Sequence, residues 1–217
     1  MPDSCTRMHF AELEAVTVDG YGTLLHLVDP VPALSSALSK HGVERSPEEV
    51  SAAFAAEVAH YRPNAVRGRD EESLAELRRE CVGIFLEAAG AGLDPADFVD
   101  AFMEALRFEL VPGAREVLEG LRVRGLQLAV AANWDCSLHA QLERLGADRL
   151  FSAVVTSAEA GAAKPDPAVL RIALERLGAD PARALHVGDE DADERAARAA
   201  GMRFAPAPLE TAFAGWL

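Results

Sequence analysis

Short runs of apolar, partly β-branched residues occur near the start of the chain and again throughout its second half. They predict strands at 14–19, 126–132, 152–156, 184–188 and 202–205, and segments of helical periodicity between them predict helices at 113–124, 137–145, 167–177 and 192–200. Strands that alternate with helices form parallel sheets covered on both faces. The pattern therefore predicts an α/β fold, a doubly wound parallel sheet built from residues 1–26 and 112–217.

The segment between these two parts, residues 27–111, shows no strand-like alternation. Its apolar residues recur at helical spacing and predict four helices, at 31–41, 47–61, 71–90 and 95–108. Helices with one apolar face bury those faces against one another. We therefore expect a small all-helical domain, residues 27–111, inserted after the first strand.

The first predicted strand leads directly into Asp19. Residues 16–18 are Val-Thr-Val, typical of a buried parallel strand, and Gly20 and Gly22 allow the backbone to turn immediately afterwards. Open α/β sheets bind ligands at the carboxyl ends of their strands, so this carboxylate faces a crevice and is a candidate nucleophile. An ordinary Asp-Gly turn is the alternative for this segment taken alone.

Three later segments place polar side chains at strand ends or before helices. They are Asn133-Trp134-Asp135, Gly161-Ala162-Ala163-Lys164-Pro165-Asp166-Pro167 and Gly188-Asp189-Glu190-Asp191-Ala192-Asp193. Lys164 is one of two lysines against nineteen arginines, which favours a position that requires a compact charge; a solvated lysine before a helix is the alternative. Asp189 and Asp193 can face one crevice and form an all-oxygen Mg²⁺ site with Asp19, although helix capping also explains one of them.

The order and spacing of these four segments resemble the haloacid dehalogenase (HAD) superfamily over most of the chain. The resemblance implies a Rossmann-like core and a helical cap that excludes water and selects the substrate. It implies that Asp19 is the nucleophile and that Lys164 neutralises both the nucleophile and an anionic substrate. It also implies that Asp19, Asp189, Asp193 and the backbone carbonyl of Tyr21 bind Mg²⁺.

Two positions depart from the pattern of the HAD phosphatases. Tyr21 stands where those enzymes carry an aspartate that protonates the leaving group, and a phenol is a poor acid for that role at neutral pH. Ala132 supplies no hydroxyl at the phosphate-binding position and leaves Asn133 as the nearest polar side chain. The Asp-x-Tyr-Gly-Thr-Leu pattern resembles the 2-haloacid dehalogenases instead, but those enzymes use no metal and lack a strongly acidic fourth motif.

Further candidate substrate contacts follow from position and charge. Together with Ala132 and Asn133 they are Thr23, His26, Arg62, Arg67 and Arg69. The three arginines fall in a predicted loop between two inserted helices and suit a carboxylate or phosphate, although solvated surface arginines explain them equally well. His26 is a candidate substitute for the missing acid, with a purely structural histidine as the alternative.

Charge, hydropathy and cysteine content exclude several classes of protein. The formal charge of −14 argues against nucleic-acid and anionic-membrane partners, and no apolar stretch reaches the roughly 20 residues of a membrane span. Cys5, Cys81 and Cys136 show no metal or redox spacing, so we expect reduced thiols in a cytoplasmic protein. The sequence thus predicts a Mg²⁺-dependent hydrolase of a small phosphorylated, anionic metabolite, with a metal-independent 2-haloacid dehalogenase or a non-catalytic ligand-binding protein as alternatives.

Overall fold

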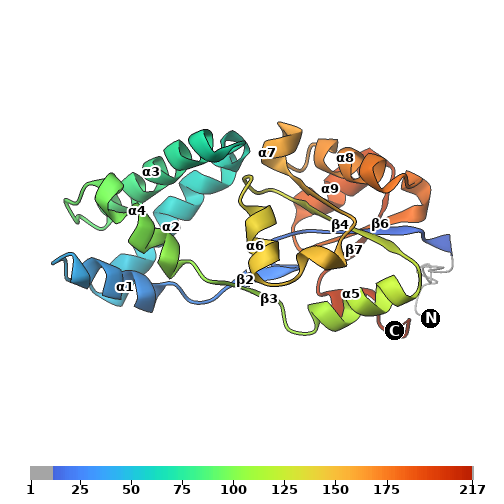
Figure 1. The fold of residues 1–217 in the computed structure, drawn as a ribbon, viewed down its shortest axis with the longest axis horizontal. Helices are drawn as coiled ribbons and strands as arrows, with labels where there is room; N and C mark the ends of the chain where they lie inside the picture. Colours follow the sequence, from blue (N-terminus) through green and yellow to red (C-terminus); the bar gives the residue numbers. More distant parts are fainter. Residues whose placement is uncertain (1–11, 217) are drawn as a thin grey trace, which may run out of the picture.

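The computed structural model of this protein describes residues 12–216 and contains a five-stranded sheet in which all neighbouring strands are parallel (Figure 1). The sheet consists of β1 (Ala15–Val18), β4 (Gln127–Ala132), β5 (Ala153–Thr156), β6 (Ala184–Gly188) and β7 (Arg203–Pro206). Their order is β5-β4-β1-β6-β7, so β1 is central and the chain returns across it between β5 and β6. The carboxyl ends of β4, β1 and β6 therefore lie side by side, as at a topological switch point.

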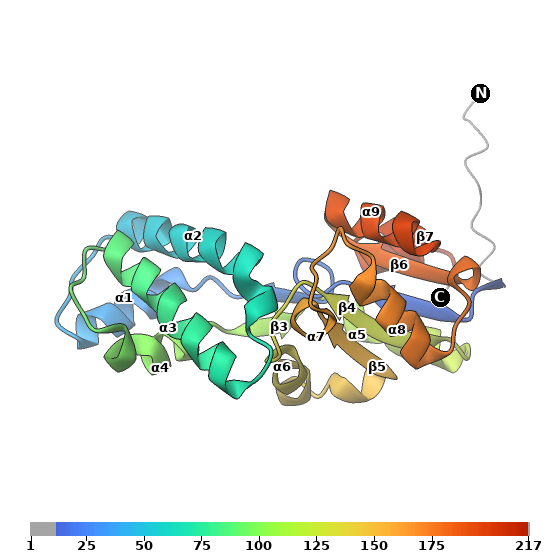
Figure 2. The ribbon, with the colours of Figure 1, turned by 90° about the horizontal axis from the view of Figure 1, so that it is seen from above.

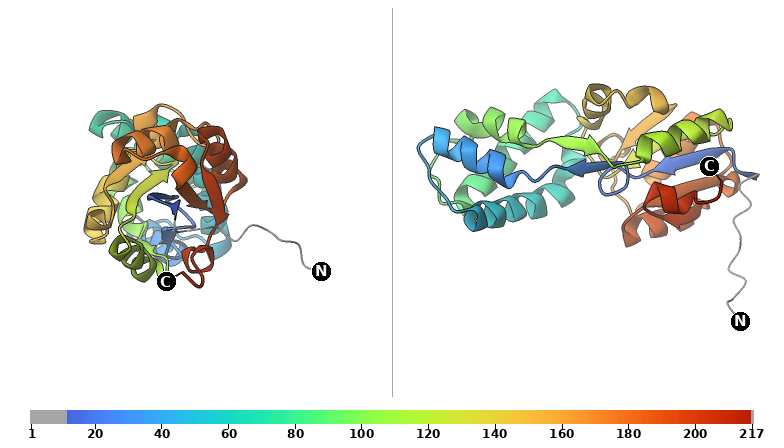
Figure 3. Two further views of the ribbon diagram at one scale, coloured as in Figure 1. Left: turned by 90° about the vertical axis from the view of Figure 1, so that its right-hand side faces the viewer. Right: turned by 90° about the horizontal axis from the view of Figure 1, so that it is seen from below.

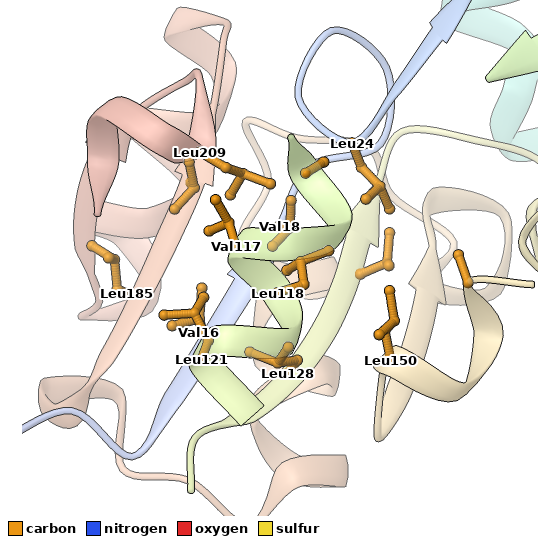
Figure 4. Packing of buried hydrophobic residues seen from close by; sticks show 14 of the residues in the cluster. Val16, Val18, Leu24, Val117, Leu118, Leu121, Leu128, Leu150, Leu185 and Leu209 are labelled. Atoms are coloured by element: carbon orange, nitrogen blue, oxygen red, sulfur yellow. The ribbon is translucent and has the colours of Figure 1, made fainter. Parts of the chain in front are cut away.

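Helices cover both faces of the sheet, which confirms the predicted doubly wound fold. These helices are α5 (Ala114–Val123), α6 (Leu138–Arg144), α7 (Ser157–Ala160), α8 (Ala168–Leu177), α9 (Asp191–Ala200) and α10 (Leu209–Ala212), with single 3-10 turns at Asp148–Leu150 and Pro181–Arg183. Figure 4 shows Leu118 and Leu121 of α5 packed against Val16 of β1. Helices α8 and α9 bury apolar residues on the opposite face, mostly leucines from α8 and alanines from α9. Alternate residues of β1 thus enter two different cores.

Four further helices lie between the first strand and the rest of the sheet in sequence. They are α1 (Val31–Lys40), α2 (Pro47–Asn64), α3 (Glu71–Ala88) and α4 (Pro95–Ala105), with a 3-10 turn at Ala65–Arg67. Figures 2 and 3 show them as a separate group beyond one end of the sheet. Phe85, Phe98 and Phe102 are almost completely buried in a third apolar cluster that belongs to these helices alone. The exact limits of the predicted domain, residues 27–111, remain a prediction.

Two short strands join the helical group to the sheet, and the sequence analysis missed both. Strand β2 (Leu25–Leu27) pairs antiparallel with β3 (Phe108–Leu110), with Leu25 opposite Leu110. The expectation that 27–111 contains no strand and that a helix runs to 108 is therefore wrong. Helix α4 ends at Ala105 because Leu106 adopts an extended conformation. Three-residue strands are too short to show a period-two pattern, and their partners lie far apart in sequence.

Helix α2 also continues further than the periodicity predicts. It ends at Asn64, so Arg62 lies in its last turn, and Arg67 belongs to the 3-10 turn that follows. The predicted arginine loop is therefore mostly helical. Within residues 12–216 no helix has the length and apolar character needed to cross a bilayer. Cys81 and Cys136 are free cysteines, while Cys5 lies outside the described residues.

Candidate active site

Asp19 follows the last residue of β1 and lies next to the ammonium group of Lys164. The Nζ atom of Lys164 donates to Asp19 Oδ1 at 2.5 Å and to the carbonyl oxygen of Ala131 at 2.8 Å, and it lies 2.6 Å from Asp193 Oδ1. An ammonium has three donors and no acceptor, so these three oxygens use its whole hydrogen-bonding capacity. The structure therefore brings together the predicted nucleophile, the predicted lysine and one predicted metal ligand.

Burial and charge act in opposite directions at this cluster. Burial raises the pKa of the Asp19 carboxyl above its ordinary value, and the Lys164 ammonium opposes that shift. Burial alone would lower the pKa of Lys164, but the carboxylates of Asp19 and Asp193 outweigh it and raise that pKa. For Asp193 burial is likewise outweighed, because hydrogen bonding from His186 and the charge of Lys164 lower its pKa. The lysine thus stays charged between two acidic groups.

Asn133 holds the backbone of Lys164 in place. Its Oδ1 atom accepts the Lys164 N–H at 2.7 Å, and its Nδ2 atom donates to the Lys164 carbonyl oxygen at 3.0 Å. The amide predicted to contact substrate therefore has a positioning contact in the structure. Ala132 is buried beside it, and a Cβ atom at Gly20 would approach the Ala132 methyl group to 2.9 Å. The methyl side chain of Ala132 offers no hydroxyl group at the end of β4, and the packing against Gly20 leaves little room there.

The three predicted acidic ligands converge at the same edge of the sheet. One carboxylate oxygen from each of Asp19, Asp189 and Asp193 lies within 4.8 Å of the other two. Two glycines permit the arrangement: a Cβ atom at Gly188 would overlap the Asp193 carboxyl group, and one at Gly22 would overlap that of Asp189. Gly22 also has a positive φ of 89°, which L side chains rarely adopt.

Asp189 and Asp193 each have a neighbour that orients them. The hydroxyl of Thr23 donates to Asp189 Oδ1 at 3.2 Å, and Thr23 is only 1% exposed. His186 is fully buried, and burial lowers its pKa, so the ring is neutral. Asp193 can only accept, so His186 Nε2 donates to it at 3.2 Å and Nδ1 accepts from the hydroxyl of Thr17 at 2.8 Å. Sequence reasoning did not identify this hydrogen-bonded chain.

A cavity of about 290 Å³ separates this cluster from the inserted helices. Asp19, Tyr21, Asn133, Lys164 and Asp193 line it on the side of the sheet. The opposite wall carries the apolar side chains of Leu27, Phe54, Val58, Leu77, Phe102, Met103, Leu106 and Phe108, with Glu57, Tyr61, Arg62, Arg78 and Cys81 among them. A cavity at strand ends that combines an apolar wall with convergent polar groups is typical of a small-molecule site.

Direct contacts hold the inserted helices against the sheet. The hydroxyl of Tyr61 on α2 donates to Asp135 Oδ2 at 2.8 Å, and Arg62 forms an ion pair with Glu190 at 3.1 Å. The N–H of Cys136 donates to the carbonyl oxygen of Gly68 at 2.9 Å. Tyr61 and Asp135 also line the cavity and were not among the predicted site residues. No local pattern marks them, since they lie 74 positions apart.

The remaining predicted substrate contacts are not all brought to the cavity. Arg62 and Tyr21 line it, and Tyr21 is 46% exposed. Arg67 instead forms two hydrogen bonds with the carboxylate of Glu80, at 2.7 and 3.1 Å. His26 lies opposite Glu109 in the two-stranded ribbon, and Arg69 is exposed. Thr23, Ala132, His26, Arg67 and Arg69 are not among the residues that line the cavity.

The buried carboxyl of Glu57 should make the stability of the protein depend on pH. Burial raises the pKa of its carboxyl from 4.5 to about 7, with a hydrogen bond to Cys81 opposing the shift. Between these values the folded chain holds a proton that the unfolded chain has lost, so stability falls as pH rises through this window, by about 3 kcal/mol in total. Glu57→Gln, neutral at every pH, should remove this loss.

Urea unfolding of wild type and Glu57→Gln at pH 5 and pH 8 measures this effect. From pH 5 to pH 8 the free energy of unfolding of wild type should fall by about 3 kcal/mol relative to that of the variant. Glu48→Gln, at an exposed position of the same helix, serves as the control and should follow wild type. Parallel stability curves for wild type and Glu57→Gln would contradict the prediction.

Comparisons with known proteins agree with this geometry. A family model described as haloacid dehalogenase-like hydrolase matches residues 13–201. The mouse (Mus musculus) haloacid dehalogenase-like hydrolase domain-containing protein 3 is 33% identical over 204 residues, which cover 89% of this chain and 81% of that protein. A phosphoserine phosphatase of Thermus thermophilus is 41% identical over 122 residues, which cover 54% of this chain and 48% of the enzyme.

Solved structures show the same fold. A 2-haloacid dehalogenase from Pseudomonas syringae pv. Tomato DC3000 superposes with a TM-score of 0.61 and 25% identity, covering 88% of this chain and 85% of the enzyme. Relatives thus include both a phosphatase and a dehalogenase, so likeness alone does not select the reaction. The family match over most of the chain, together with the Asp19, Lys164 and acidic cluster, shows that this protein belongs to the haloacid dehalogenase-like hydrolases.

Proposed function

We propose that this protein hydrolyses a small phosphorylated metabolite, with Asp19 as the covalent nucleophile and Mg²⁺ as cofactor. One observation carries the proposal: Asp19, Lys164 and Asp193 line one end of the cavity, and the Asp189 carboxylate lies next to those of Asp19 and Asp193. The donor set fits Mg²⁺, because three carboxylates supply hard oxygen ligands within 4.8 Å of one another. The backbone carbonyl of Tyr21 is the proposed fourth ligand. Bound Mg²⁺ would neutralise the charge of the transferred phosphoryl group.

The two oxygens of Asp19 have different roles in this proposal. Oδ1 is held by Lys164, whereas no hydrogen bond within residues 12–216 engages Oδ2. Oδ2 attacks phosphorus, forming a P–O bond to Asp19 as the P–O bond to the leaving group breaks and that group departs as an oxyanion, which takes its proton from water. Water then attacks the aspartyl phosphate, which releases inorganic phosphate and restores the Asp19 carboxylate. Lys164 keeps Asp19 oriented and places a positive charge beside the phosphoryl oxygens.

Phosphate release from a panel of aryl, acyl and alkyl phosphates, with and without a chelator, tests the proposed reaction. We expect release that requires Mg²⁺ and disappears with the chelator. Halide release from 2-haloacids in the presence of chelator would overturn it in favour of a dehalogenase. Stabilisation by a ligand without turnover of any substrate would instead indicate a binding protein.

The metal site makes a separate prediction for Asp189. This side chain is exposed and contributes one of the three carboxylates, so Asp189→Asn should keep the fold and weaken Mg²⁺ binding. Millimolar Mg²⁺ should raise the melting temperature of wild type by mass action and leave that of Asp189→Asn nearly unchanged. Asp191→Asn, an exposed neighbour outside the cluster, should behave like wild type. Equal shifts in all three proteins would argue against this metal site.

The tyrosine at position 21 should determine which leaving groups the enzyme prefers. It lines the cavity at the position from which the family's acid acts, yet a phenol donates its proton poorly at neutral pH. The enzyme should therefore favour aryl and acyl phosphates, whose leaving groups need no proton. Tyr21→Asp should raise kcat/KM most for alkyl phosphates, by about 10²-fold, because the benefit of an acid grows with leaving-group basicity.

Tyr21→Phe is the matched control for that substitution, since it removes the hydroxyl and keeps the ring. It should leave the order of substrates unchanged. If Tyr21→Asp changes kcat/KM equally for all leaving groups, or lowers it for all of them, Tyr21 shapes the cavity and does not limit proton transfer.

A second candidate function is hydrolysis of a 2-haloacid. Tyr21 and the apolar cavity wall favour it, because halide departs without a proton and an apolar site suits a carbon–halogen bond. The cluster of Asp189 with Asp19 and Asp193 favours the metal-dependent reaction. Chelator therefore separates the two functions: dehalogenation should survive it and phosphate release should not.

A further inference from the structure

The cavity contains three cationic side chains, and two of them already have partners. The Lys164 ammonium is saturated by three oxygens, and Arg62 is paired with Glu190. Arg78, on α3, lines the same cavity and forms no hydrogen bond or ion pair with any residue in the range 12–216. Its side chain is half-buried. A cation in this position lacks the counter-charge that the other two possess.

Apolar side chains line the cavity wall that includes Arg78, and on its outer side Arg78 also borders a groove with Asp100 and Glu104 of α4, with neither of which it forms an ion pair. Leu77 precedes it on α3, and Phe102 and Met103 of α4 line the same wall of the cavity. A guanidinium that loses water without gaining a partner costs free energy, and a bound anion offsets that cost. Glu57 is no permanent counter-charge, because its carboxyl has a pKa of about 7. The wall thus combines an apolar surface with one cationic side chain, Arg78, that forms no ion pair within residues 12–216.

We propose that Arg78 binds a carboxylate on the substrate, at the far end of an apolar body that lies against the inserted helices. The inference rests on the proposed function for the phosphate end of that substrate. A single carboxylate matches one guanidinium, because its two oxygens can accept two parallel N–H hydrogen bonds from it. A second phosphate fits less well, because the acidic side chains that line this small cavity, Asp19, Glu57, Asp135, Glu190 and Asp193, outnumber its cations.

Sequence patterns do not distinguish Arg78 from its neighbours. Arg78 and Arg79 are adjacent on α3, but only Arg78 lines this cavity, whereas Arg79 is exposed. Successive residues of a helix point about 100° apart, so only one of the two can face the site. Arg79→Gln therefore provides a control with the same change of charge on the same helix.

Binding of two non-hydrolysable ligands of one shape tests the inference: 4-carboxybenzylphosphonate and its neutral amide, 4-carbamoylbenzylphosphonate. Calorimetry with Mg²⁺ present should show wild type binding the carboxylate at least about tenfold more tightly than the amide. Arg78→Gln should abolish this preference and leave affinity for the amide unchanged. Arg79→Gln should retain the preference.

Three outcomes would overturn the assignment of Arg78. They are equal affinity of wild type for both phosphonates, an equal loss of affinity for both in Arg78→Gln, and no detectable binding of either ligand. Hydrolysis of the corresponding carboxyphenyl and carbamoylphenyl phosphates is measured in parallel. Selective, Arg78-dependent binding without hydrolysis would refute the proposed phosphatase function and keep the carboxylate site, so the two failures are distinguishable.

Discussion

Replacement of Asp19 with asparagine should lower turnover by at least about 10⁴-fold, the scale of loss when a covalent nucleophile is removed. The amide has nearly the volume of the carboxylate but cannot attack the substrate. Lys164 keeps Asp193 and the Ala131 carbonyl as partners, so the fold should survive. Steady-state kinetics and thermal unfolding of the same preparation measure both expectations.

Asp191→Asn is the matched control for the nucleophile, because it makes the same chemical change at the exposed first residue of α9. It should retain the turnover of wild type. Turnover of Asp19→Asn within about tenfold of wild type would remove Asp19 from the nucleophilic role. A large loss of melting temperature would instead show that the carboxylate is needed mainly to hold Lys164.

Replacement of Lys164 with methionine should lower the free energy of unfolding by about 3–5 kcal/mol at pH 7.5. The substitution leaves the buried carboxylates of Asp19 and Asp193 without their shared cation and the Ala131 carbonyl without its donor. Without the ammonium, the folded-state pKa of the Asp193 carboxyl should rise above that of the unfolded chain, and the pKa of Asp19, already raised by burial, should rise further. Stability of the variant is then lost as pH increases, so its deficit should shrink towards pH 5.

Urea unfolding at pH 5 and 7.5 measures that deficit. The chain offers a natural control in Lys40, its other lysine, which lies exposed at the end of α1. Lys40→Met should cost less than about 0.5 kcal/mol at both pH values. A Lys164→Met deficit no larger than that of Lys40→Met, or one independent of pH, would show that the ammonium does not hold the two carboxylates.

Local sequence signals predicted the parallel sheet and the acidic residues at the ends of its strands. The apolar run before Asp19 predicts a buried strand, and Asp189 and Asp193 are only four residues apart. Such features depend on neighbouring residues, so a pattern can reveal them. The parallel sheet follows from the same signals, because strands and helices alternate after residue 112. The close approach of Lys164 to Asp19 required the resemblance to a known family in addition, since 145 positions separate them.

Tertiary packing decided the contacts between distant segments of the chain. The ribbon of β2 and β3 and the hydrogen bond from Tyr61 to Asp135 join segments that carry no sign of one another in sequence. The sequence predicts a substrate contact for Asn133, and only the structure shows that its amide also holds the backbone of Lys164.

Three arginines at and after the end of α2 show why sequence patterns do not reveal which charges reach the site. Arg62, Arg67 and Arg69 stand out in sequence as a cluster, yet Arg67 is neutralised by Glu80 and Arg69 is exposed. Arg78 faces the cavity only because α3 packs with one particular face against α2 and α4. The sequence by itself determined which residues are charged and which strands end in acids. Helix rotation and long-range pairing, which depend on contacts between distant segments, decided which of those charges reach the site.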